Sequence, residues 1–236
     1  MLRLIGPLFV ALVVLVAAGC VAAAGGHDAP DYAIVVSGTG RVSVAPDIAL
    51  LMLGVESQAP TLAEATADAA RRMSAVVARI KALGIADADI ATVAYSVDPR
   101  TAPTDPARRD PPRIVGYYVS NLAQVTVRKL ADAGSVLDAA VAAGANTVRG
   151  IRFALAAPEA AQAQARKSAV ADALAKAREL AAAAGVTLGP VLTIRESGAP
   201  TPAPMRAMAL RMESTPIEPG QLEVAVTIEL RQAIAR

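Results

Sequence analysis

The side chains that most often carry catalysis are scarce in this 236-residue chain. It has one cysteine, Cys20, and one histidine, His27, and both lie near the N-terminus. The rest of the chain therefore has no Cys–His nucleophile pair, no Ser-His-Asp triad and no His-based zinc site. A single cysteine also excludes a disulfide within the chain. We expect no enzymatic activity and no cofactor, and His27 is expected to be a solvated linker residue.

Two glycines raise the question of phosphate binding. Gly38 and Gly40 follow a strand-like pair of valines, but a dinucleotide fingerprint needs a third glycine where Ser43 stands. It also needs a helix that begins at the loop, whereas strand-like residues and Pro46 follow here. The glycine pair therefore predicts a tight β-hairpin turn between two strands.

Three methionines could supply soft ligands. Met205, Met208 and Met212 lie three and four residues apart, and on a short helix they would share one face. Such a thioether cluster could bind Cu(I) or react with oxidants. Methionines far more often fill apolar contacts, and we prefer that interpretation, which leaves no metal site.

Charged residues of both signs lie in a proline-rich segment at 98–113. Paired carboxylates could transfer protons, but charges of mixed sign among prolines are typical of a solvated loop or a partner contact. The residues concerned are Asp98, Arg100, Asp105, Arg108, Arg109 and Asp110. Elsewhere we expect a structural role for Asp47 and a turn conformation for Asn146.

The N-terminus has the pattern of an export signal. Arg3 precedes the uncharged apolar segment 4–18, and small residues follow. The sequence at 17–20, Ala-Ala-Gly-Cys, resembles a bacterial lipobox, in which Cys20 would carry a lipid and attach the protein to the outer membrane. The usual leucine is replaced by Ala17. We prefer this route slightly over the alternatives.

Two other outcomes remain open for this segment. Alanines at 22–24 fit the small-x-small rule for ordinary cleavage before Gly25. The uncharged run 4–26 is also just long enough to remain as a membrane anchor. All three readings place the rest of the chain outside the cytoplasm, in the periplasm or cell envelope.

Composition limits the partners. The chain has 23 basic and 21 acidic residues, and aromatic residues make up 3%. Nucleic-acid binding needs a strongly basic face or stacking aromatics, so we expect no nucleic-acid partner. The 54% of hydrophobic residues must build a core from Ala, Val, Leu and Ile.

Periodicity predicts an α+β fold. Apolar positions three and four apart, a Thr61–Glu64 capping box and Gly84 predict a helix at 61–83. An Ala-rich helix is expected at 158–184, with a possible Asp172–Lys176 pair, and a short one at 132–143. Strands are expected at 31–38, 41–57, 89–97, 114–129, 147–155, 190–197 and 221–231.

The order of these elements suggests an internal repeat. A strand, a long helix, a strand, a proline-rich loop and a strand occur at 41–128 and again at 147–231. We therefore expect a pseudo-duplicated α+β domain with mixed or antiparallel sheets. The expected organisation is a signal segment at 1–26, a linker at 27–30 and one domain at 31–236.

Three segments resemble the SIMPL-domain family. They are 36–57, with its Gly-x-Gly-x-Val and later Pro-Asp, 133–155, where Gly-Ala-Asn precedes a strand, and the helix 165–185. The resemblance implies an α+β fold in bacterial periplasmic or envelope proteins, some linked to oxidative-stress tolerance, some immunogenic and some forming rings. The resemblance implies no catalytic residues in this chain.

Two functions follow as expectations. The first is a non-enzymatic envelope protein that forms a homo-oligomer and acts as a scaffold or stress-protective factor. Its long strands offer edges for pairing between copies. The second is a periplasmic module that binds a small ligand or a metal ion along its proline-rich loops.

Overall fold

Two antiparallel sheets, each covered by helices on one face, form the molecule. The computed structural model describes residues 32–103, 111, 113–198, 202–204 and 219–235. The strands are β1 (Ala33–Val44), β2 (Ile48–Ala59), β3 (Ile90–Thr101), β4 (Ile114–Val127), β5 (Thr147–Ala154), β6 (Thr187–Ser197), β7 (Ala203–Pro204) and β8 (Leu222–Ala235). The helices are α1 (Leu62–Ala82), α2 (Ala133–Ala142) and α3 (Glu159–Ala184), with short 3₁₀ turns η1 (Asp87–Asp89) and η2 (Leu130–Asp132). The predicted α+β class is confirmed.

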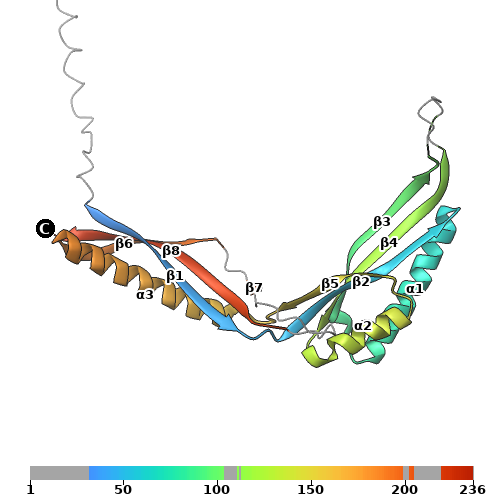
Figure 1. Ribbon diagram of the computed structural model, residues 1–236, viewed down its shortest axis with the longest axis horizontal. Helices are drawn as coiled ribbons and strands as arrows, with labels where there is room; N and C mark the ends of the chain where they lie inside the picture. The colour runs from blue at the N-terminus through green and yellow to red at the C-terminus, as the bar shows by residue number, and fades with distance from the viewer. Residues whose placement is uncertain (1–31, 104–110, 112, 199–201, 205–218, 236) are drawn as a thin grey trace, which may run out of the picture.

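The first sheet has the order β1-β8-β6, and the short strand β7 also pairs with β8. The second has the order β3-β4-β2-β5. We call the first sheet with α3 the β1 unit, and the second sheet with α1 and α2 the β2 unit. In Figure 1 the two units form an open V, with the helices outside and the bare sheet faces turned inward.

The two units repeat one arrangement. In each, a first strand pairs with the last strand, and the strand after the long helix pairs with the other side of that last strand. The elements are β2-α1-β3-β4 in one unit and β1-α3-β6-β8 in the other. The predicted duplication is therefore present, but its strand at 147–155 was assigned to the wrong unit. That strand, β5, pairs with β2, and β1 takes its expected place.

Local signals explain the helices. The Thr61 side chain accepts from the Glu64 backbone N–H, and the Glu64 side chain accepts from the Thr61 N–H, so the predicted capping box is confirmed. Helix α3 ends at Gly185, whose φ of 67° closes the last turn as only glycine does readily. The strand predicted at 221–231 is also confirmed as β8, and every second residue in its first half is buried: Leu222, Val224, Val226, Ile228 and Leu230.

Each unit has its own core. Large side chains of β2, such as Leu51 and Leu53, pack with Val76 and Ile80 of α1 in the β2 unit. The core of the β1 unit instead uses an alanine row on α3 against the apolar side of β8. This row consists of Ala165, Ala169, Ala173, Ala177 and Ala181.

Candidate functional site

The glycine pair lies in the middle of a strand, so the predicted hairpin turn is wrong. β1 runs unbroken through Gly38 and Gly40 to Val44. A Cβ on Gly40 would lie 1.9 Å from the carbonyl oxygen of Ala165, and one on Gly38 would lie 2.1 Å from that of Ala169. The glycines are needed because the α3 backbone approaches the strand closely. β1 ends at Val44 and β2 begins at Ile48, so the chain is interrupted around Pro46, which also corrects the single long strand expected at 41–57.

The close approach lets α3 cover the outer edge of β1. Asp172 Oδ2 accepts from the Thr39 backbone N–H at 2.8 Å, and Lys176 Nζ donates to the Ser37 carbonyl oxygen at 3.0 Å. Asp172 and Lys176 also form the predicted i,i+4 pair at 2.7 Å. Hydrogen bonds from Lys176 and then Thr39 lower the pKa of Asp172. At Ser37 and Thr39 the outer backbone of this edge strand is therefore already hydrogen-bonded and not free to pair with another strand.

The β5 edge of the second sheet is guarded differently. A register shift between Met52 and Leu53 marks a bulge opposite Arg149, and Gly150 has a φ of 139°. Arg149 is exposed and pairs with Glu56 at 3.3 Å. Bulges and charged side chains are the usual ways in which proteins prevent edge-to-edge pairing.

The other two outer strands, β3 and β6, also have register shifts, near Val93 and near Leu192, and Glu196 of β6 pairs with Arg166 at 2.9 Å. They differ in how many apolar side chains they expose. Within the described residues no strand pairs with the outer side of either. Val97 pairs with buried Val119 of β4, and Ile194 pairs with buried Leu230 of β8. Paired residues share a face, so Val97 and Ile194 lie on the helix side of their sheets.

These side chains are nevertheless exposed. Val97 is 37% exposed and Ile194 is 51% exposed, because α1 packs on β2 and β4, and α3 mainly on β1 and β8. Neighbouring apolar side chains on the same strands are exposed too: Val93 and Tyr95 on β3, and Val191 and Leu192 on β6. We call these two strands the open edges, and they occupy equivalent positions in the two units.

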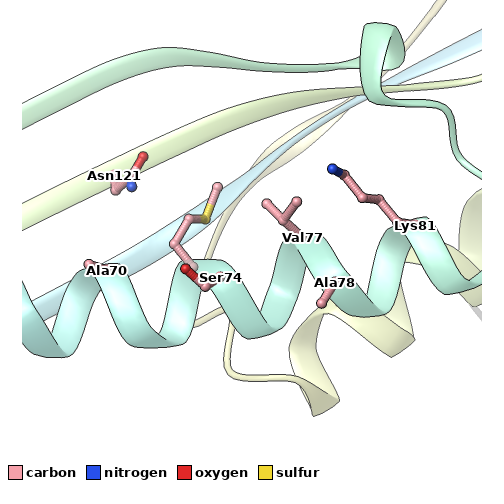
Figure 2. Close-up of a pocket in the computed structure, with 7 residues that line it drawn as sticks. Ala70, Ser74, Val77, Ala78, Lys81 and Asn121 are labelled. Atoms are coloured by element: carbon pink, nitrogen blue, oxygen red, sulfur yellow. The ribbon is translucent and has the colours of Figure 1, made fainter.

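A groove of about 490 Å³ runs beside α1 (Figure 2). Its lining is mostly small or apolar: Ala70, Met73, Ser74, Val77, Ala78, Lys81 and Asn121. Figure 2 shows Val77 and Lys81 rising from α1 on the side where Asn121 lies on β4. The buried Oδ1 of Asn121 has no hydrogen-bond partner among the described residues.

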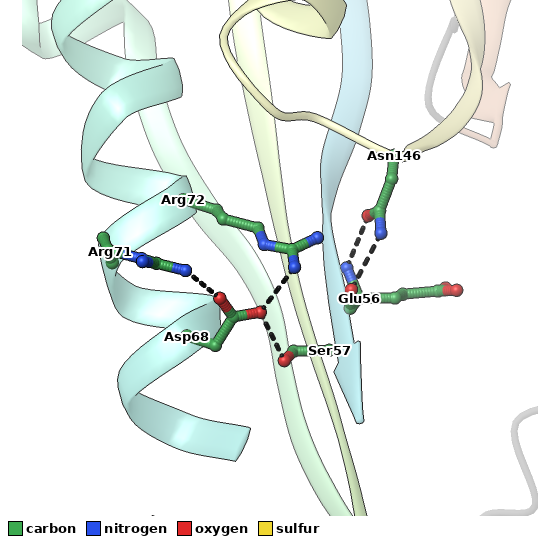
Figure 3. A network of polar contacts seen from close by, with 6 residues as sticks. All are labelled: Glu56, Ser57, Asp68, Arg71, Arg72 and Asn146. Atoms are coloured by element: carbon green, nitrogen blue, oxygen red, sulfur yellow. Dashed lines mark hydrogen bonds and ion pairs between the residues drawn. The ribbon is translucent and has the colours of Figure 1, made fainter. Parts of the chain in front are cut away.

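A polar network holds α1 against β2 (Figure 3). The Ser57 hydroxyl donates to Asp68 Oδ2 at 2.8 Å, Arg72 pairs with the same carboxylate at 2.9 Å, and Arg71 also donates to it. The hydrogen bond from Ser57, followed by those from the two arginines, lowers the pKa of Asp68. This network positions a helix and offers no unpaired nucleophile.

Two further contacts fix the strands of this unit. Asn146 accepts from the Glu56 N–H at 2.7 Å and donates to the Glu56 carbonyl at 2.8 Å, an amide–backbone clamp (Figure 3). Arg128 donates to both carboxylate oxygens of Asp89, at 2.8 and 2.7 Å, and so joins the start of β3 to the end of β4. The sequence predicts only a turn at Asn146 and neither of these contacts, because the partners are distant in sequence.

Of the other residues singled out for chemistry, the structure describes Asp98 and Arg100. Asp98 and Arg100 lie exposed on β3, which extends further into the expected loop than predicted. Cys20, His27, the loop residues Asp105, Arg108, Arg109 and Asp110, and the methionines Met205, Met208 and Met212 lie outside the described residues. Within the described part of the chain, no three His, Cys, Asp or Glu residues could hold a metal ion.

The helices that are described do not include one long and apolar enough to cross a membrane. This statement covers α1, α2 and α3 and not the N-terminal segment 1–31.

Comparison with known proteins identifies the family. The model of the family described as "SIMPL: Protein of unknown function (DUF541)" matches residues 34–231. The chain is 37% identical over 206 residues to the 26 kDa periplasmic immunogenic protein of Brucella melitensis biotype 1, covering 84% of this chain and 82% of that protein. It is 34% identical over 174 residues to the uncharacterized protein YggE of Escherichia coli K12, covering 73% and 69%. The match spans both units of the fold, and the chain belongs to the SIMPL family.

Proposed function

We propose that this chain is a non-enzymatic protein of the bacterial periplasm or cell envelope that assembles with copies of itself. The name of the Brucella relative supports the location, as does the export pattern at 4–18. A lipid on Cys20 would attach the assembly to the outer membrane. Cleavage before Gly25 would release it into the periplasm.

The observation that carries the self-assembly proposal is the run of exposed apolar side chains on β3 and on β6. One edge is protected, by Asp172 and Lys176 on β1 and by a bulge with Arg149 on β5. The other edge, β3 or β6, is open and carries exposed apolar side chains. An outer strand that exposes several apolar side chains is a template for another strand, so a stable protein is expected to cover it.

The position of the open edges suggests how copies join. They lie in different units, at the two arms of the V (Figure 1). Each copy can therefore contact two neighbours, one through β3 and one through β6. Contacts of this kind generate a closed ring when the rotation between neighbours closes, and a filament when it does not.

Lysine substitutions test this assignment. Val97→Lys on β3 and Ile194→Lys on β6 would each place a charge in an interface, and we expect both to reduce the mass measured by size-exclusion chromatography with light scattering. Val148→Lys is the matched control. Val148 is 45% exposed and pairs with buried Leu53, but it lies on the protected β5 edge. Unchanged mass for the β3 and β6 variants, with folding verified by circular dichroism, would refute the proposal.

The biological role of the assembly is a scaffold or stress-protective factor. A deletion strain is expected to become more sensitive to peroxide, and the wild-type gene should restore tolerance. The Val97→Lys and Ile194→Lys variants should fail to restore it at equal abundance. Full restoration by both variants would separate stress protection from assembly.

The groove beside α1 favours a second candidate function, binding of a small ligand. Its apolar lining and the unpartnered Oδ1 of Asn121 suit an apolar molecule with one hydrogen-bond donor. Protein purified from its own envelope should then carry a small-molecule mass, and Ser74→Leu, which fills the groove, should remove it. Purified protein without any adduct would count against this candidate.

A further inference from the structure

Only two short links connect the units. The chain leaves the β1 unit at 45–47, between β1 and β2, and returns to it at 155–158, between β5 and α3. Among the described elements, no helix or strand of one unit packs extensively against the other unit. The relative orientation of the two arms therefore depends on these links.

The links lie side by side because of strand pairing. Ile48, the first residue of β2, pairs with Ala154, the last residue of β5. One step beyond this pair, the Asp47 backbone N–H donates to the Ala154 carbonyl oxygen at 3.1 Å. The two links thus emerge from the β2 unit at one point and run together toward the β1 unit.

Asp47 also joins the links through its side chain. Its Oδ1 accepts from the backbone N–H of Ala156 at 2.7 Å, across 109 residues of sequence. A carboxylate acceptor makes a shorter and stronger hydrogen bond than a neutral one. Pro46 restricts the backbone on one side of this contact, and Pro158, at the N-cap of α3, does so on the other.

We propose that Asp47 is a hinge clamp: its carboxylate ties the two links together and sets the angle between the units. The backbone bond to Ala154 alone extends the β2–β5 ladder and leaves both links free to pivot beyond it. The side-chain bond to Ala156 reaches past the end of the ladder. It thereby holds the link at 155–158 at a fixed place relative to the link at 45–47.

The clamp has a consequence for assembly, which rests on the proposed function. The open edges β3 and β6 belong to different arms, so the angle at the hinge determines the rotation from one copy to the next. A fixed angle favours one closed assembly. A free angle favours a mixture of assembly sizes, because the rotation from one copy to the next is then no longer fixed.

Pulsed electron spin resonance can measure the angle between the arms directly. Cysteines replace exposed Ala75 on α1 and exposed Ala175 on α3, in the full chain with Cys20→Ser. The spin-labelled protein is diluted into unlabelled protein so that each assembly holds about one labelled copy. We expect a narrow distance distribution with Asp47, a broader and shifted one with Asp47→Ala, and a narrow one with Asp47→Asn, whose amide oxygen can still accept from Ala156.

Controls separate the hinge from the fold and from assembly. A label pair within the β2 unit, at Ala75 and Ser96, should give the same distribution with and without Asp47→Ala. An unchanged inter-unit distribution in Asp47→Ala would overturn the clamp, whatever the oligomeric state. If Asp47→Ala does not fold, hydrogen exchange of the Ala156 amide in the wild-type protein decides: protection supports the clamp, and exchange at the rate of a free loop refutes it.

Discussion

Gly38 and Gly40 contribute by the absence of a side chain. They let the α3 backbone lie directly on β1, facing the alanines at 165, 169 and 173. That contact brings Asp172 and Lys176 within hydrogen-bond distance of the strand's outer edge. Two residues that look like a ligand-binding loop in the sequence thus protect an edge in the structure.

Gly40→Ala should test this packing. Its new Cβ would overlap the Ala165 carbonyl, so either α3 or β1 must move, and overpacking of this kind costs about 1–3 kcal/mol of unfolding free energy or more. Chemical denaturation monitored by circular dichroism measures the loss. Ser43→Ala, at an exposed position of the same strand, should change stability little. Equal stability of Gly40→Ala and wild type would show that the helix does not sit this close.

Asp68 gives stability a defined dependence on pH. The hydrogen bond from Ser57 lowers the pKa of Asp68 in the folded protein. The contribution of Asp68 to the unfolding free energy is therefore fully present above the pKa of about 4 that it has in the unfolded chain. The contribution is lost as the pH falls through the lower folded pKa. The difference in unfolding free energy between wild type and Asp68→Asn should therefore shrink as the pH falls below about 4.

A second carboxylate provides the comparison for Asp68. Asp87 pairs with Lys81 at 2.9 Å, but its side chain is 80% exposed. An exposed pair of this kind contributes little, so Asp87→Asn should follow the wild-type curve across the same pH range. A constant difference between wild type and Asp68→Asn from pH 7 to pH 3 would contradict the role given to Asp68.

At the scale of elements, much of the fold could be predicted from the sequence. Helices α1, α2 and α3 and the long strands other than β1 and β2 lie close to their predicted ranges, because apolar spacing and end signals such as Thr61 and Gly185 are local. Strand partners are not local. The assignment of β5 to the wrong unit and the false turn at Gly38 arose because periodicity predicts a strand without its neighbours.

The open edges and the hinge could not be predicted for the same reason. Exposure of Val97 and Ile194 depends on where α1 and α3 come to rest on their sheets. The bond from Ala156 to Asp47 joins residues that only pairing of β2 with β5 brings together. The sequence did indicate a structural role for Asp47, but it predicted one strand through Pro46 and did not indicate which segments Asp47 joins.

The capping box of α1 makes a prediction at this scale. Thr61→Ala removes the acceptor for the Glu64 N–H and should cost about 1 kcal/mol of unfolding free energy. Thr66→Ala makes the same chemical change within the helix, where the hydroxyl only donates to the Leu62 and Ala63 carbonyls, and it should be neutral or slightly stabilising. Equal losses in both variants would mean that the cap contributes nothing specific.

At the scale of the whole molecule, the structure consists of two packed units, the β1 unit and the β2 unit, and the two short links at 45–47 and 155–158 that join them. Each unit has its own core and its own protected edge. The duplicated arrangement presents two equivalent open edges on one chain. Self-assembly and the hinge clamp are therefore related proposals, since the first depends on the edges and the second fixes their relative direction.

Native mass spectrometry of protein purified from its own envelope tests the central claim, self-assembly, most directly. We expect an oligomer whose mass is an integer multiple of the processed chain, with no small-molecule or metal mass added. The same spectrum shows whether each chain carries a lipid on Cys20. A monomer, above all one with a bound small molecule, would contradict self-assembly and favour the groove beside α1 as the functional site.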